Sequence, residues 1–136
     1  MVWWKTAVMA IGIGLMLAAC GGTVASGGNG TADQSGCIVK GASTATPAVT
    51  SNVIPDPNAL GRFVPNNMTV KVGQSIEWNW QDPSVQHSVT SDDGTTFDSC
   101  LQNNGYKFIV TFTQAGSISY RCTIHPSMVG TITVTK

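Results

Sequence analysis

Charged side chains are scarce in this chain of 136 residues. They make up 10% of it, and seven basic residues balance seven acidic ones, whereas globular chains average about 25% charged residues. Without an excess of Lys and Arg the chain lacks the basic surface that binding to nucleic acid requires. Without a block of like charges it also lacks the pattern of a charged disordered tail. We therefore expect no nucleic-acid partner.

Long apolar runs are absent as well. The apolar stretch at residues 7–19 follows Lys5 and is shorter than the roughly 20 residues of a membrane-spanning helix, which is typical of a secretory signal. Its end, Leu17-Ala18-Ala19-Cys20, resembles the lipobox of bacterial lipoproteins. That resemblance implies a cleaved signal peptide at residues 1–19 and acylation of Cys20, with chains such as palmitate. We expect a lipid anchor on the outer side of the cytoplasmic membrane.

Helical periodicity is missing throughout the rest of the chain. Residues 21–36 are rich in glycine, serine and threonine, a composition typical of a flexible tether. The sequence predicts a lipidated tether over residues 20–57, with a candidate strand at residues 49–54. The folded domain is predicted for residues 58–136.

Apolar residues alternate with polar ones in five short runs of that domain, and turn residues such as Asp92-Asp93-Gly94 separate the runs. The runs cover residues 69–72, 76–80, 107–112, 117–122 and 131–135. This pattern predicts an all-β sandwich or small barrel. Trp78 and Trp80 share a parity with Ile76, so we interpret them as core residues rather than redox relays.

Histidine is rare, and its placement is informative. Cys122, His125 and Met128 lie within seven residues, on a predicted loop between two strands, and His87 is the only other histidine. Two imidazoles, a thiolate and a weak thioether are the donor set of a blue-copper site. Zinc is the alternative metal, but structural zinc sites use four Cys or His donors and no thioether.

The ordered motifs of residues 63–136 resemble those of the cupredoxins, the plastocyanin-like blue copper proteins. They are Phe63-Val64-Pro65, His87-Ser88-Val89, Phe97-Asp98-Ser99 and Cys122-x2-His125-Pro126-x-Met128-x-Gly130. The two-residue gap between His125 and Met128 is more similar to that of amicyanin than to that of plastocyanin. The resemblance implies a Greek-key β-sandwich with one type 1 copper, bound by His87, Cys122, His125 and Met128.

Two further expectations depend on that resemblance. In related proteins the residue after the upstream histidine hydrogen-bonds to the loop of the cysteine ligand, which here implies a bond from Ser88 to the Thr123 backbone. With Cys20 and Cys122 assigned, Cys37 and Cys100 remain, in a compartment where disulfides persist. We predict a Cys37–Cys100 disulfide.

The implied function is that of a single-electron carrier, not an enzyme, with the electron leaving through His125. The expected partners are redox proteins such as a cytochrome or a membrane oxidoreductase, and the chain is expected to be a monomer. A copper-delivery lipoprotein is the main alternative, although it usually has more exposed Met and His donors. An oxidase or reductase subunit would need more histidines, and a metal-free adhesion domain would leave the Cys-His-Met cluster unexplained.

Overall fold

The computed structural model describes residues 36–136 and contains eight strands. They are β1 (Val49–Ile54), β2 (Arg62–Val64), β3 (Asn67–Lys71), β4 (Ser75–Trp80), β5 (Thr90–Ser91), β6 (Lys107–Thr111), β7 (Gly116–Arg121) and β8 (Val129–Thr135). The expected signal peptide, Cys20 and most of the glycine-rich stretch lie outside the described residues. A helix that could span a membrane is not found among residues 36–136.

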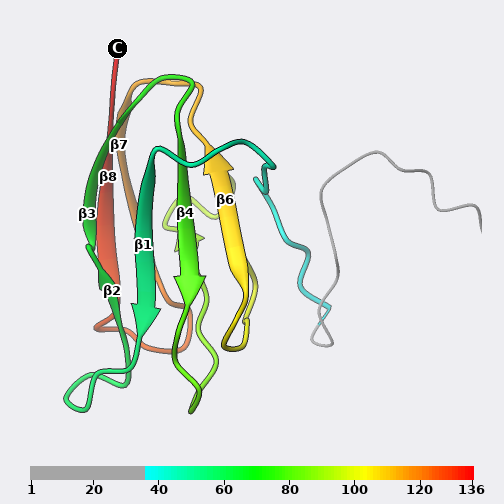
Figure 1. Cartoon of the computed structure of the whole chain (residues 1–136), viewed down its shortest axis with the longest axis vertical. Helices are drawn as coiled ribbons and strands as arrows, with labels where there is room; N and C mark the ends of the chain where they lie inside the picture. Colours follow the sequence, from blue (N-terminus) through cyan, green and yellow to red (C-terminus); the bar gives the residue numbers. More distant parts are fainter. Residues whose placement is uncertain (1–35) are drawn as a thin grey trace, which may run out of the picture.

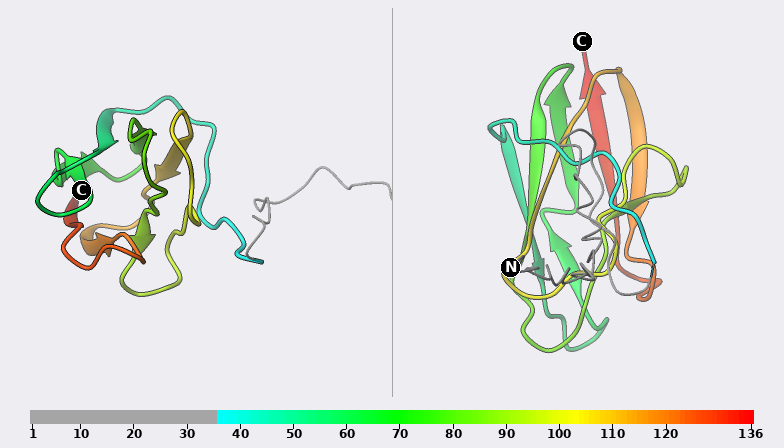
Figure 2. Two further views of the ribbon diagram at one scale, coloured as in Figure 1. Left: turned by 90° about the horizontal axis from the view of Figure 1, so that it is seen from below. Right: turned by 90° about the vertical axis from the view of Figure 1, so that its right-hand side faces the viewer.

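The strands form two four-stranded sheets, ordered β2-β1-β4-β6 and β3-β8-β7-β5. Each sheet combines one parallel pair, β1 with β4 and β3 with β8, with antiparallel neighbours. The two sheets lie face to face, and the strands of both run along the long axis of the molecule (Figures 1 and 2). The predicted all-β sandwich is therefore confirmed.

The alternating sequence pattern explains which side chains fill the space between the sheets. In β4, Ile76, Trp78 and Trp80 point to one face and are all buried, because successive residues of a strand point to opposite sides. Tyr120 of the other sheet packs edge-on against Trp78, with ring centroids 5.6 Å apart. The interpretation of the tryptophans as core residues is consistent with this packing.

The folded part begins earlier than the predicted boundary at residue 58. The candidate strand at residues 49–54 is present as β1, and it lies inside its sheet, between β2 and β4. Val39 is buried in the core, and Cys37 forms the predicted disulfide with Cys100. No periodicity marks this stretch in the sequence, because its sheet neighbours and the disulfide, rather than an alternating pattern, hold it in place.

Three loops meet at one end of the sandwich. They follow β1, β4 and β7, and all three lie at the lower end of the molecule as drawn in Figure 1. The parallel pairing of β1 with β4 brings the first two together. This end contains the predicted metal ligands.

Candidate metal centre

The loop after β7 carries three of the predicted ligands, Cys122, His125 and Met128, and is closed by its own backbone. The Cys122 amide donates to the Met128 carbonyl at 2.9 Å, and the Met128 amide donates to the His125 carbonyl at 2.9 Å. These two bonds fold residues 122–128 into a compact loop. Met128 is brought back beside Cys122, and its side chain is 1% exposed.

His87 reaches the same place from the other direction along the chain. Its backbone exchanges two hydrogen bonds with Gln102, N to O at 3.2 Å and O to N at 2.9 Å. The Trp80 indole Nε1 donates a third bond, of 2.9 Å, to the His87 carbonyl. The residue is fixed on both sides although it belongs to no strand.

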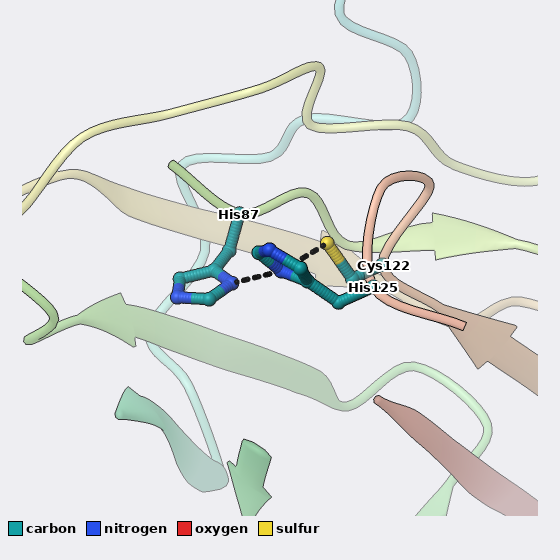
Figure 3. A group of neighbouring side chains, drawn as sticks. All are labelled: His87, Cys122 and His125. Atoms are coloured by element: carbon teal, nitrogen blue, oxygen red, sulfur yellow. Dashed lines mark hydrogen bonds between the residues drawn. The ribbon is translucent and has the colours of Figure 1, made fainter. Parts of the chain in front are cut away.

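His87, Cys122 and His125 converge, as Figure 3 shows. The two Nδ1 atoms are 3.0 Å apart, and the Cys122 Sγ lies 3.6 Å from the His125 Nδ1. All three donor atoms lie within 4.8 Å of one another. Atoms that bind one ion at about 2.0–2.3 Å must be this close. The donor set and its spacing fit a copper ion, because imidazole and thiolate suit this metal.

The surroundings favour the thiolate form of Cys122. Burial by itself would raise the pKa of the thiol, but the contact with the His87 ring and hydrogen bonds from the amides of Ser88, Ile124 and His125 lower that pKa to about 6. The Ser88 amide donates to the sulfur at 3.3 Å. For His87 the effect of burial is opposite: by itself it would lower the pKa of the imidazole. The contacts of His87 with Cys122 and Asp82 outweigh burial and raise that pKa. A thiolate is the form that binds metal.

The predicted bond between Ser88 and Thr123 is present. The Thr123 amide donates to the Ser88 Oγ at 2.9 Å, and the two hydroxyl oxygens lie 3.1 Å apart. Ser88 therefore joins the segment of His87 to the loop of Cys122 through both its backbone and its side chain.

Two residues at the centre were not identified from the sequence. Asp82 contacts the His87 Nε2 through its Oδ2 at 2.8 Å, and the backbone of Gly61 lies against the His87 ring. Asp82 had a signal, because Asp-Pro-Ser is a turn sequence in which the aspartate binds backbone two residues on. Gly61 had none, since its contact arises only in the folded chain.

Comparison with known proteins agrees with this geometry. Residues 51–135 match the family model of copper binding proteins of the plastocyanin/azurin family. The chain belongs to this family. No curated protein matches the sequence significantly, but solved cupredoxin structures do resemble the fold.

A purple cupredoxin from Nitrosopumilus maritimus is 29% identical, with a TM-score of 0.53 over 62% of this chain and 99% of its own. A copper-containing nitrite reductase from Thermus scotoductus is 27% identical with a TM-score of 0.55. The match covers 67% of this chain but 23% of the reductase. An oxidised amicyanin mutant, 23% identical, shares the fold with a TM-score of 0.54, over 67% of this chain and 85% of its own.

As a cupredoxin, this protein holds one copper ion in its His-Cys-His cluster. The expected Greek-key sandwich is the fold of these relatives. The site lies at the end of the sandwich where the loops after β1, β4 and β7 meet (Figure 1).

Proposed function

We propose that this cupredoxin is a single-electron carrier with a type 1 copper centre. The observation that carries the proposal is the cluster of His87, Cys122 and His125, buried at one end of a rigid sandwich. Bound copper supplies a one-electron couple between Cu(I) and Cu(II). Ligands that are fixed by the fold reduce the rearrangement that accompanies this change of charge.

Met128 is the proposed fourth ligand, a weak axial thioether. Its backbone bonds to both Cys122 and His125, and its side chain is buried at the ligand end of the core. A buried methionine in that position can approach the copper without forming part of the tighter His-Cys-His set. Ser88 supports the loop through its bonds to Thr123.

His125 is the proposed exit for the electron. It is 8% exposed, whereas His87 and Cys122 are at most 1% exposed, and the neighbouring Ile124 is 48% exposed. An apolar surface around the most accessible ligand suits docking of a redox protein, such as a cytochrome or a membrane oxidoreductase. The domain would act as a monomer, and a lipid on Cys20 would hold it at the outer side of the cytoplasmic membrane.

The test is the visible spectrum of the full chain, purified in detergent and loaded with Cu(II). We expect an intense thiolate-to-copper band that disappears with a reductant and returns with an oxidant. Cys122→Ser should lack the band, and Ser127→Ala, an exposed change in the same loop, should keep it. A colourless wild type, or a band retained in Cys122→Ser, would refute the proposal.

A measurement of copper retention distinguishes a copper-delivery protein from an electron carrier. A carrier keeps its copper through repeated reduction and oxidation in the presence of a Cu(I) chelator, whereas a delivery protein loses it on reduction. The anchor is tested independently by mass spectrometry of the chain, with Cys20→Ser as the control that lacks the lipid mass.

A further inference from the structure

The His87 ring has a different partner on each nitrogen. Its Nδ1 faces the other ligands, 3.0 Å from the His125 Nδ1, and its Nε2 contacts the Asp82 Oδ2 at 2.8 Å. Both side chains are buried, with exposures of 0% for His87 and 1% for Asp82. The contact therefore lies in the interior, where charges interact more strongly than in water.

Asp82 is itself held in a single orientation. The backbone amide of Ser84 donates to the Asp82 Oδ1 at 2.8 Å, and the Ser84 hydroxyl donates to the same oxygen. That leaves Oδ2 to His87. An ionised carboxylate only accepts hydrogen bonds, so the proton of the neutral imidazole lies on Nε2 and Nδ1 presents a lone pair toward the site.

Glycine confines the ring on another side. A Cβ on Gly61 would lie 2.3 Å from the His87 Cε1, which no real packing tolerates. The loop reaches this position through Leu60, which adopts a left-handed backbone with φ of 61°, a conformation that costs energy for a residue with a side chain. The backbone of Gly61, rather than a side chain, therefore packs against the His87 ring.

We infer that Asp82 is a positioning residue for copper: it fixes the tautomer of His87, and its negative charge favours Cu(II) over Cu(I). The inference rests on the proposed role of His87 as a ligand and extends it to the carboxylate behind the ring. Carboxylates behind metal-bound histidines orient the ring and raise its basicity. A more basic ligand and a nearby negative charge both stabilise the more positive ion, so Asp82 lowers the reduction potential.

The first test measures the reduction potential of Asp82→Asn. The change removes the charge at constant shape, and a single amide oxygen can no longer accept from both Ser84 and His87. We expect an increase of about tenfold in the preference for Cu(I), or about 59 mV for a one-electron couple. Ser84→Ala, which frees the carboxylate to rotate, should shift the potential in the same direction by less.

Asp56→Asn is the matched control. Asp56 borders the same surface cavity as Asp82 but pairs with Arg62 rather than with a ligand. Its removal should leave the potential unchanged. An Asp82→Asn potential that is equal to the wild type, or that is matched by Asp56→Asn, would overturn the inference.

The second test needs no copper. Nitrogen NMR of the metal-free chain at alkaline pH, where the ring is neutral, should show His87 as the Nε2–H tautomer in the wild type and in Asp56→Asn, and as a mixture in Asp82→Ala. A mixture already in the wild type, or an unchanged tautomer in Asp82→Ala, would contradict the inference. If the wild type forms no thiolate–copper band, the proposed function fails, while this measurement still decides whether Asp82 fixes the ring.

Discussion

His87 and His125 contribute the same chemical group to the centre but are held in different ways. The His87 ring is enclosed by Asp82 and Gly61, and its backbone is bonded to Trp80 and Gln102. The His125 ring contacts the other two donors, and within residues 36–136 its Nε2 has no hydrogen-bond partner. The comparison shows one ligand enclosed by the fold and one just beneath the surface.

This division agrees with two demands on the proposed electron carrier. A fixed ligand preserves the geometry of the metal, and a ligand near the surface shortens the path to a partner.

The largest difference is expected from replacing each ring with glycine and adding free imidazole. The space left by His125→Gly opens to solvent, because that ring is partly exposed, whereas the space left by His87→Gly is sealed. External imidazole should restore the visible band of copper-loaded His125→Gly and not that of His87→Gly. Recovery in His87→Gly alone would reverse the contrast.

Removing the disulfide should cost the most stability. The bond between Cys37 and Cys100 closes a loop of 63 residues, which corresponds to about 4 kcal/mol on a chain-entropy model. Urea unfolding of the double variant Cys37→Ser/Cys100→Ser measures this loss. Cys100 lies two residues before Gln102, so amide exchange should increase more at His87 than at Cys122. An equal increase in amide exchange at His87 and Cys122 would show that the disulfide does not stabilise the segment of His87 more than the loop of Cys122.

Alkaline pH tests whether the part of the domain around His87 and the part around Cys122 unfold together, as parts of one core. Burial raises the pKa of Tyr120 to about 12, so the unfolded chain releases this proton at lower pH than the folded chain. The free energy of unfolding is then unaffected below pH 10 and falls by about 2–3 kcal/mol between pH 10 and 12. Tyr120→Phe should lack this fall in urea titrations. Loss of structure around Cys122 before that around His87 would show two separate units.

Gly61→Ala should destabilise the protein by about 2 kcal/mol, because the added methyl group forces the His87 ring to move. Gly116→Ala is a close control: its φ of 153° matches the 155° of Gly61, but nothing lies within 4 Å of its added Cβ. The difference between the two variants in urea unfolding and in copper affinity isolates the contact with His87. Equal effects would assign the cost to backbone conformation alone.

Ser88→Ala should have the smallest effect, about 1 kcal/mol. The Ser88 Oγ loses its bonds to the Thr123 amide and to the hydroxyls of Thr123 and Thr90. The Thr90 hydroxyl keeps Asp98 as a partner and the exposed Thr123 hydroxyl can bind water, so the Thr123 amide bears most of the cost. The backbone bond from residue 88 to the Cys122 sulfur remains, so the visible band of the copper-loaded protein should persist. Ser117→Ala, at an exposed position of β7, provides the reference for urea unfolding. Loss of the band would mean that the Ser88 hydroxyl, rather than the Ser88 amide, joins the segment of His87 to the loop of Cys122.

The sequence identified the ligands better than their supports, and the reason is physical. Cys122 and His125 are three residues apart on one loop, so their meeting is a local property that spacing reveals. The burial of Trp78 and Trp80 in the core could be predicted from the alternation of apolar and polar residues along the strand. Gly61 and Asp82 meet His87 only after β1 has paired with β4, and β1 was hard to assign because its partners in the sheet fix its position. The early start of the fold at Cys37 depends on a covalent contact with a distant cysteine.

The Cys37–Cys100 bond also decides how the domain bears mechanical load. A pull between the N-terminal side of Cys37 and the C-terminus passes from Cys37 to Cys100 through the disulfide, so the backbone between them carries no tension along the chain. His87, Asp82 and Gly61 all lie in that shielded stretch, whereas Cys122 and His125 lie in the loaded remainder. Under force, the centre should open from the side of its seven-residue loop while the pocket of His87 stays intact.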